Sequence, residues 1–363
     1  MDMDMNLIVR APVRISFGGG GTDLPVYYER HGGLVVSTTI SYYVYTILTP
    51  GWPGGVQIIS ADYRALCQRP TCEDLIWNGD LSLPKAVTYY FNIRDGLTIF
   101  LASQIPPGTG LGSSGSVAVS MIKALAFWCG LDLAPAEVAE QACYIEIEKM
   151  GMPVGKQDQY AAAFGGLNCI TFSRNGVAVE PLQVPSGTHE ALEEGLMLFF
   201  TGTSRQSSTI LRRQRQASQK GDRATVNRLN AIKELGLEVR AALEEGDMEA
   251  FGDLLHRSWI EKRRLTEGIT NPFLDQCYQE ALNNGALGGK ITGAGGGGFL
   301  MLYCPEERQE AVTEALTDLG LQRRLFTLDH EGVQVMQVMP QLRPQTLHRT
   351  PLFAGMERVG VER

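Results

Sequence analysis

The stretch from Pro106 to Val119, PPGTGLGSSGSVAV, combines four glycines with three serines ahead of an apolar helical pattern. Glycines leave backbone N–H groups free to face a ligand, and the N-terminus of a helix favours an anion. Ser113 and Ser114 stand where that helix would begin. The stretch therefore predicts a polyphosphate site, and the alternative is a tight turn whose serines only cap the helix.

The same glycines do not fit two common nucleotide motifs. Gly110, Gly112 and Gly115 spell G-x-G-x-x-G, but the dinucleotide fingerprint needs them directly after a strand at the start of a βαβ unit. Here Pro106 and Pro107 intervene, after five expected strands. The Walker pattern fails as well, because no lysine stands at the position that it requires.

A glutamate in the next segment points inward on helical periodicity. Residues 135–151 read as a helix, in which Glu146 shares a stripe with Val138 and Ile145 while Glu148 falls on the polar side. A buried carboxylate without a partner is costly. A bound cation is therefore a natural partner for Glu146, and an Arg or Lys from elsewhere in the chain is the alternative.

Asp158 lies between two glutamines in GMPVGKQDQYAAAFGG, ahead of an alanine-rich helical turn. Phosphoryl transfer to an alcohol needs a metal ion and often a carboxylate that accepts the hydroxyl proton. Glu146 and Asp158 offer these two functions. The alternative for Asp158 is an N-cap of the short helix that follows.

A third candidate region, APVRISFGGGGTDLPVYYERHGG, ends a strand on the glycines Gly18–Gly21. Four glycines cost backbone entropy that a simple turn would avoid, so close approach of a ligand or of another chain segment explains them better. Asp23 stands before a helix with Pro25 in its first turn, and N-capping is its alternative role. Arg14, on an apolar strand, requires a nearby anion.

Strand and helix signals along the chain indicate an α+β protein. After about Pro185 the order of strand, helices, strand, helix and strands favours an antiparallel sheet with helices on one face. The expected strands are 7–17, 34–40, 43–48, 56–63, 97–105, 196–204, 324–328 and 333–338, with an Asn-Gly hairpin at 168–182; the expected helices are 113–130, 135–151, 207–245 and 305–319, with two more before 284.

The composition fits a globular protein of about two domains, because 44% of the 363 residues are hydrophobic and 20% are charged. The formal net charge of −8 gives no general attraction to nucleic acid or to an anionic membrane, so neither is an expected partner. Seven scattered cysteines without a zinc spacing predict reduced, mostly buried thiols and a cytoplasmic protein. Neither a signal peptide nor a membrane span is expected.

Four motifs, APVRISFGGGGTDLP, PPGTGLGSSGS, GKQDQYAAAFGG and GGKITGAGGGGFL, resemble in order and spacing those of the GHMP small-molecule kinases. The resemblance covers nearly the whole chain. It implies a ribosomal-protein-S5-like N-terminal ATP-binding domain, here 1–185, packed on a ferredoxin-like C-terminal domain, here 186–340, with 341–363 unassigned. It also implies a sugar kinase that uses ATP and Mg²⁺. A homodimer is a possible oligomeric state.

The resemblance also implies roles for individual positions. Asp158 would be the catalytic aspartate, Arg14 would balance its charge and that of the transferring phosphoryl group, and Ser114 and Glu146 would bind Mg²⁺. The implied phosphate-binding residues are Gly108, Gly110, Leu111, Gly112, Ser113 and Ser114, and the implied sugar-binding residues are Gly20, Gly21, Thr22, Asp23, Gly293 and Gly295. For a sugar that already carries a phosphate, the cationic candidates are Arg205, Lys262, Arg263 and Lys290, and the alternative for each is a solvated position on the surface.

Within the family the motifs are most similar to those of heptose 7-phosphate kinases, which phosphorylate the anomeric hydroxyl of a heptose phosphate for nucleotide-activated heptose and surface glycans. L-fucokinase domains share much of the pattern. Galactokinases carry Glu-His where this chain has Gly20 and Gly21, which argues against galactose. Gly115 stands where a small side chain is usual, so the choice of serine ligand stays open.

Two alternatives come from other functional classes. A sugar- or nucleotide-sensing protein could keep the fold without catalysis, but Ser114, Glu146 and Asp158 are all present. A nucleic-acid binder could use the basic stretch 211–220, but the overall balance of charge is acidic. We therefore expect an enzyme.

Overall fold

The computed structural model describes residues 5–50, 55–93, 96–202, 208–219 and 222–340. The strands are β1 (Met5–Gly18), β2 (Gly33–Pro50), β3 (Val56–Ser60), β4 (Ala65–Arg69), β5 (Leu97–Ser103), β6 (Asn168–Ser173), β7 (Gly176–Pro181), β8 (Leu196–Phe200), β9 (Gly288–Ile291), β10 (Phe299–Tyr303), β11 (Gln322–Arg324), β12 (Leu328–Asp329) and β13 (Gln334–Pro340). The α-helices are α1 (Pro25–His31), α2 (Ser82–Tyr90), α3 (Ser113–Trp128), α4 (Pro135–Cys143), α5 (Gln157–Phe164), α6 (Thr188–Gly195), α7 (Ser208–Gln219), α8 (Arg223–Glu245), α9 (Met248–Lys262), α10 (Pro272–Asn283) and α11 (Gln309–Asp318). Short 3-10 turns η1 (Cys72–Asp74) and η3 (Glu306–Arg308) and a π-helical turn η2 (Tyr144–Lys149) complete the described elements.

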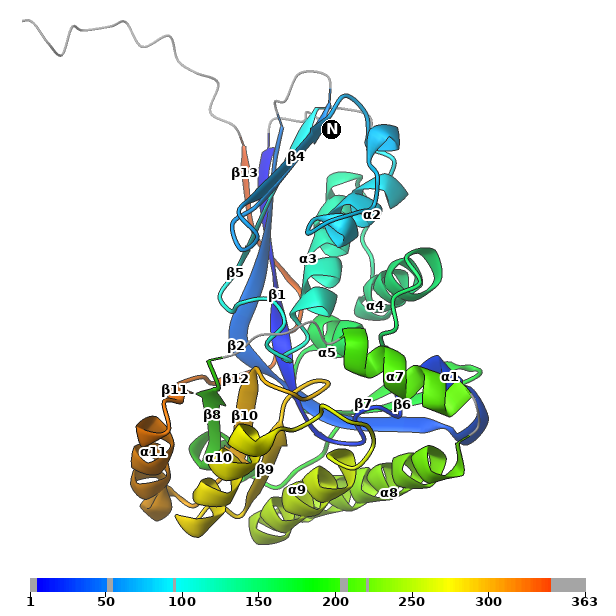
Figure 1. Cartoon of the computed structure of the whole chain (residues 1–363). Coiled ribbons are helices and arrows are strands. Elements are labelled where there is room, and N and C mark those ends of the chain that lie inside the picture. Colours follow the sequence, from blue (N-terminus) through cyan, green and yellow to red (C-terminus); the bar gives the residue numbers. More distant parts are fainter. Residues whose placement is uncertain (1–4, 51–54, 94–95, 203–207, 220–221, 341–363) are drawn as a thin grey trace, which may run out of the picture.

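The larger of two sheets has the central order β13-β1-β2-β5-β3-β4, with β6 and β12 also paired to β2 and β7 paired to β6. Helices α2 to α5 cover one face of it (Figure 1). Helix α3 is apolar nearly all round and buried, as the sequence predicts, so Val119 and Ile122 lie in the same core as Leu48 and Ile99 of the strands.

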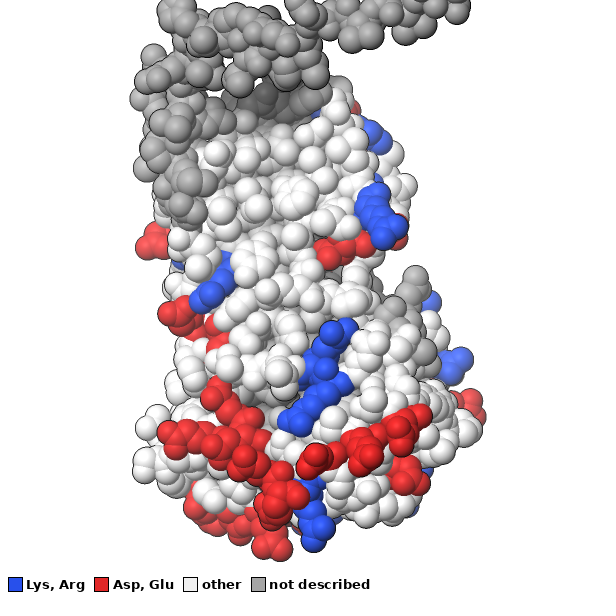
Figure 2. Space-filling view, turned by 90° about the vertical axis from the view of Figure 1, so that its left-hand side faces the viewer, with Lys and Arg blue, Asp and Glu red and all other residues white. Residues whose placement is uncertain are grey.

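On the opposite face of the large sheet, α8 packs against one end of β1 and β2. The part of this face formed by β5, β3 and β4 carries no helix in Figure 1, and Figure 2 looks onto it. Partly exposed apolar side chains such as Ile47 and Phe100 stand there, and few charged ones are visible. Lower in the same view acidic side chains gather. Among the exposed acidic residues of the chain are Glu306 of η3 and Glu310 and Glu314 of α11.

The smaller sheet has the order β11-β8-β10-β9 and is antiparallel throughout, which confirms the sequence prediction. Alternate side chains of β8 serve two cores. Phe199 packs in a cluster with Trp259 of α9 and residues of α10 and α11. Leu198 packs in a second cluster with Phe17 of β1 and Val239 of α8, so this sheet is buried on both faces.

Several predicted boundaries were wrong. The strands 34–40 and 43–48 are one strand, β2, and the predicted helix 207–245 is two helices, α7 and α8. The predicted strand 324–328 is split, because β11 pairs with β8 while β12 pairs with β2 of the other sheet. The range 186–340 therefore contributes strands to both sheets.

No helix in the described ranges is long and apolar enough to cross a membrane. Six of the seven cysteines are buried, as the sequence predicts, and Cys129 is exposed. The compartment stays a prediction.

Helix α8 contacts the first glycine run directly. A Cβ on Gly18 would lie 2.8 Å from the Cα of Gly236, and a Cβ on Gly236 would lie 2.9 Å from Leu34 Cδ2 and 3.0 Å from the backbone nitrogen of Gly19. Real Cβ atoms do not approach backbone that closely. Close approach of another chain segment, which the sequence offered as one reason for the glycines, is thus present.

We expect Gly236→Val to lower the free energy of unfolding by about 2 kcal/mol or more, because the added methyl groups must push α8 away from β1. Chemical denaturation followed by circular dichroism measures the loss. Leu237→Val, at a neighbouring side chain that is 43% exposed, is the control and should cost about 0.5 kcal/mol. Equal losses in the two variants would contradict this packing.

Candidate active site

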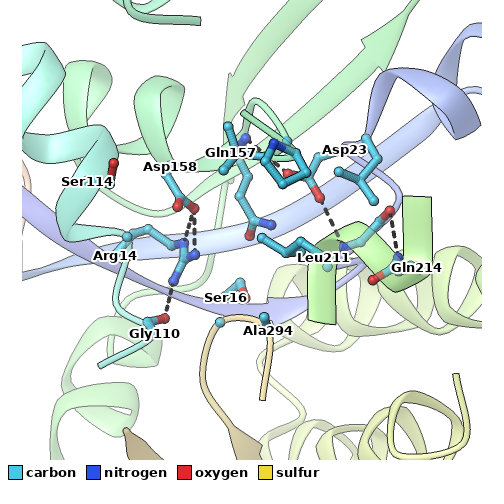
Figure 3. A pocket seen from close by; sticks show the side chains of 18 of the residues that line it. Arg14, Ser16, Asp23, Gly110, Ser114, Gln157, Asp158, Leu211, Gln214 and Ala294 are labelled. Carbon is cyan, nitrogen blue, oxygen red and sulfur yellow. Dashed lines mark hydrogen bonds and ion pairs between the residues drawn. The ribbon is translucent and has the colours of Figure 1, made fainter. Parts of the chain in front are cut away.

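A cleft lies where the three glycine-rich stretches meet (Figure 3). Its walls come from β1, from the loops that precede α1, α3 and α5, from helices α7 and α9, and from the loop after β9. The predicted site residues that line it are Arg14, Gly20, Gly21, Asp23, Gly108, Gly110, Gly112, Ser113, Ser114, Asp158, Lys262 and Gly293.

Arg14 and Asp158 form a tight ion pair inside the cleft (Figure 3). Arg14 Nε and Nη2 donate to Asp158 Oδ1 at 2.9 and 2.5 Å, and Nη1 donates to the carbonyl oxygen of Gly110 at 2.8 Å. Arg14 is 4% exposed, so the anion that its position on an apolar strand requires is Asp158. The Asp158 side chain is 26% exposed and can still contact a ligand.

Asp158 does not act as the N-cap that the sequence offered as its alternative role. Helix α5 begins at Gln157, and its N-cap position is Lys156, which makes no capping hydrogen bond through its side chain. Asp158 lies in the first turn, where a carboxylate is favourable near the N-terminal backbone N–H groups.

The glycines of the second stretch allow α3 to approach Asp158. A Cβ on Gly115 would lie 2.7 Å from the Cβ of Asp158, and a Cβ on Gly112 would lie 3.1 Å from its Cγ. Gly112 is also the N-cap residue of α3, with a left-handed φ of 80°. The α3 N-terminus has no side-chain cap, so Ser113 and Ser114 do not serve as caps.

Glu146 is 1% exposed and points inward, as helical periodicity predicts. Its segment is not the regular helix expected, because α4 ends at Cys143 and continues as the π-helical turn η2. Such turns occur often at functional sites, where they change the direction of a side chain. Glu146 Oε1 accepts a hydrogen bond from Ser114 Oγ at 2.8 Å, and Oε2 accepts one from Gln159 Nε2 at 2.6 Å.

The Glu146 carboxylate accepts its hydrogen bonds from uncharged groups, Ser114 and Gln159, among the described residues. No Lys or Arg in the described part of the chain forms an ion pair with this carboxylate, so the alternative partner that the sequence left open is not found there. Burial raises the pKa of the Glu146 carboxyl to about 7. A hydroxyl and a carboxylate are hard oxygen donors, which fit Mg²⁺. Gln159 was not predicted, although its place beside Asp158 in the sequence was the available signal.

Asp23 is buried beside the cleft and is not an N-cap either, because Leu24 holds that position before α1. Its carboxylate accepts hydrogen bonds from the backbone N–H groups of Gly21, at 3.0 Å, and Gln157, at 3.3 Å. Burial raises the pKa of the Asp23 carboxyl, and the charge of Asp158 raises it further.

The third glycine stretch packs against the second. A Cβ on Gly293 would lie 2.6 Å from the Cα of Gly110, and Thr292 Oγ1 donates to the carbonyl oxygen of Thr109 at 3.2 Å. The loop after β9 therefore closes on the loop before α3. This contact brings two segments together that are far apart in the sequence.

Some predicted site residues do not face the cleft. The Thr22 hydroxyl is fully buried, donates to a backbone carbonyl and accepts from the backbone N–H of Leu34 at 3.0 Å. Its side chain therefore holds the chain turn and is not available to a sugar. Gly295 packs against Ile269, where a Cβ would lie 2.7 Å from a carbonyl oxygen.

Two further predicted residues lie behind the cleft wall. The Leu111 side chain is fully buried in the core, and its carbonyl oxygen accepts from the backbone N–H of Arg14 at 3.0 Å. Lys290 is 3% exposed, and its Nζ lies 3.3 Å from Ser16 Oγ. Arg205 lies outside the described residues.

A second, more apolar hollow adjoins the cleft and was not predicted. Gly108, Ser113, Ser114 and Met152 line both spaces. The remaining walls come from the β3–β4 turn, α2, α3 and β5, and include Ser60, Asp62, Tyr63, Leu83, Leu101, Ser103 and Val117. These residues carry no motif, so only the folded arrangement identifies them.

The basic stretch that begins at Leu211 lies on α7, where Arg212 and Arg213 are exposed. Leu211 and Gln214 of α7 line the cleft, and Gln214 Nε2 lies 3.4 Å from the carbonyl oxygen of Gly21. This helix therefore forms one wall of the site (Figure 3).

Comparison with known proteins gives a consistent result. Residues 82–166 match the GHMP kinases N terminal domain, and residues 239–321 match the GHMP kinases C terminal domain. The chain is 32% identical to D-glycero-alpha-D-manno-heptose 7-phosphate kinase from Campylobacter jejuni, over 91% of this chain and 98% of that protein. It is 26% identical to the L-fucokinase/L-fucose-1-P guanylyltransferase of Bacteroides fragilis, over 90% of this chain but 38% of that longer protein.

A solved structure supports the same assignment. The crystal structure of a D-glycero-D-manno-heptose 1-phosphate kinase from Bacteroides thetaiotaomicron matches with a TM-score of 0.74 and 28% identity, covering 91% of this chain and 99% of that one. The match in fold, in both domains and in sequence over nearly the full length shows that this chain belongs to the GHMP kinase family.

Proposed function

We propose that this chain is an ATP-dependent sugar kinase that phosphorylates the anomeric hydroxyl of a heptose phosphate. The observation that carries the proposal is the pairing of Asp158 with Arg14 at the point where the three glycine stretches meet. The similarity to heptose phosphate kinases over nearly the full length of both proteins supports this choice of sugar.

The nucleotide would bind across the two neighbouring hollows. The N-terminus of α3, with Ser113 and Ser114, offers backbone N–H groups to the phosphates of ATP. The adjoining apolar hollow shares both serines and suits a base and a ribose, since such sites combine apolar walls with a few polar groups. Ser114 and Glu146 would hold Mg²⁺, which neutralises charge on the phosphates when it is bound.

Asp158 would act as the base. Its carboxylate accepts the proton of the sugar hydroxyl while the hydroxyl oxygen forms a bond to the γ-phosphorus, and the bond from that phosphorus to the bridging oxygen breaks to release ADP. Arg14 keeps Asp158 in place and offsets negative charge on the transferring group. Gly20, Gly21 and Asp23 would contact the sugar, since they line the cleft beside Asp158.

Two alternatives define the first experiment. An L-fucokinase-like enzyme would prefer another sugar, and a sensing protein would bind without transfer. A coupled assay for ADP release with heptose 7-phosphate, fucose, mannose and galactose, followed by ³¹P NMR of the product, distinguishes them. We expect release with the heptose phosphate and a new phosphate on the anomeric carbon; no release with any sugar would refute the proposed function.

Asp158→Asn should reduce kcat by about 10²- to 10⁴-fold, because the amide cannot accept the hydroxyl proton. Binding of an unreactive ATP analogue, measured by calorimetry, should change little, since Asp158 lies beside the phosphate loop and does not form it. Asp132→Asn is the control, because the Asp132 side chain is 98% exposed and its ion pair with Lys123 lies outside the cleft. Full activity of the Asp158 variant would remove the proposed base.

Glu146→Gln should stabilise the metal-free protein above neutral pH. The pKa of this carboxyl is about 7 in the folded protein and 4.5 in the unfolded chain, so the folded state holds the proton between these values. Stability of the wild-type protein therefore falls as pH rises from 4.5 to 7, by about 3 kcal/mol in the limit. The Glu146→Gln variant has no carboxyl at this position and so does not lose stability in this way. Its free energy of unfolding should therefore equal that of the wild-type protein at pH 4.5 and exceed it most at pH 8.

Thermal unfolding in the presence of a chelator, at pH 5 and at pH 8, measures this difference. Glu148→Gln is the matched control, because Glu148 is an exposed glutamate in the same π-helical turn. Kinase activity and the stabilisation of the protein by added Mg²⁺ should both be lost in the Glu146 variant only. An equal response of the two variants would show that Glu146 is neither buried as described nor a metal ligand.

A further inference from the structure

Lys262, a cation that lines the cleft, forms no ion pair with a carboxylate in the part of the chain that the structure describes. Arg14 and Lys262 are the only Arg or Lys side chains that line the cleft within the described ranges. Arg14 is paired with Asp158, whereas Lys262, at the end of α9, donates to the carbonyl oxygen of Gly293 at 2.5 Å and to no described carboxylate. An ammonium group has three N–H donors, so two remain for a ligand.

A second lysine, Lys290, is buried near Lys262. Lys290 of β9 is 3% exposed, and its Nζ contacts Ser16 Oγ at 3.3 Å and the carbonyl oxygen of Phe17 at 3.4 Å, both neutral. Burial lowers the pKa of Lys290 well below its usual value, and the charges of Lys262 and Arg14 lower it further. Burial and Arg14 lower the pKa of Lys262 to about 8, while Asp23 raises it.

Lys262 is partly buried and Lys290 is buried, and both have neutral hydrogen-bond partners, so their charged forms are unfavourable unless an anion joins them. The N-terminus of α3, at Ser113 and Ser114, offers hydrogen-bond donors to the phosphates of the nucleotide. Arg14 is paired with Asp158, beside the site of phosphoryl transfer. Lys262 reaches the cleft from α9, and the carboxylate whose charge interacts with it is Asp23, in the part of the cleft where a sugar would lie. The position therefore suits an anion carried by the acceptor.

We propose that Lys262, supported by Lys290, binds the phosphate group that the acceptor sugar already carries, and so selects phosphorylated over unphosphorylated sugars. This inference rests on the proposed sugar kinase function. A phosphate dianion compensates the buried positive charge, whereas a neutral sugar leaves it uncompensated. The preference for a phosphorylated sugar would therefore come from two effects: the contact between the phosphate and Lys262, and the cost of leaving the lysine charge uncompensated when a neutral sugar binds.

The test uses the full-length protein with an unreactive ATP analogue and two ligands, D-glycero-D-manno-heptose 7-phosphate and the same heptose without its phosphate. Calorimetry gives the Kd of each sugar, and because it measures binding, it also applies to a sugar that the enzyme does not phosphorylate. We expect the wild-type protein to bind the phosphorylated sugar at least about 30-fold more tightly, and Lys262→Met to lose most of that preference. Lys262→Arg, which keeps the charge, should retain part of it.

Lys233→Met is the control, since Lys233 lies outside the cleft and donates to the backbone carbonyl of His31. The Kd of the unphosphorylated sugar should change less than about threefold in the Lys262→Met variant. If Lys262 had a purely structural role, through its hydrogen bond to Gly293, Lys262→Met would weaken the binding of both sugars by the same factor. That result would overturn the inference. In that case the sugar panel would still report ADP release, so the proposed kinase function would stand.

Discussion

The ion pair between Arg14 and Asp158 constrains the whole site. It joins the middle of β1 to the first turn of α5, and the same guanidinium also bonds the carbonyl oxygen of Gly110. A charge removed from water needs a close partner, so these three segments must meet at hydrogen-bond distance. Few packing arrangements allow that, and those that do leave no room for side chains on the loop that lies between them.

The glycines are the consequence. Gly112 and Gly115 lie against Asp158, Gly110 lies against Gly293, and Gly18 lies against α8. Each contact replaces a side chain with the backbone of another segment. The glycine-rich stretches are thus required first by how the protein packs on itself, and the same bare backbone is what can then face phosphate groups. Packing and ligand binding are served by one choice of residue.

Sequence reasoning located most of the site because its signals are local. Arg14 on an apolar strand and Glu146 on an apolar helical stripe are positions where a charge needs an explanation, and both are buried as expected. The antiparallel sheet and the buried helix α3 followed from patterning in the same way. The pairing of Arg14 with Asp158 was implied by the family resemblance and could not be derived from local signals, because it joins positions 144 residues apart.

Other features were hidden for physical reasons. The π-helical turn at Glu146 has no sequence signature, since it depends on how one helix meets its neighbours. Thr22 was predicted to contact the sugar beside Asp23, but its hydroxyl makes hydrogen bonds to the backbone within the turn. The apolar hollow beside the phosphate loop is assembled from the β3–β4 turn, α2, α3 and β5, none of which carries a motif.

The pairing of β13 with β1 has a bearing on how the molecule forms. The strand that carries Arg14 has β2 on one side and, on the other, a strand that begins at Gln334. During synthesis this strand must wait with one edge unpaired until almost all the described residues have left the ribosome. Contacts of such long sequence separation slow folding. A strand with one unpaired edge exposes backbone hydrogen-bonding groups that can pair with other chains, so the late pairing of β13 bears on aggregation during folding.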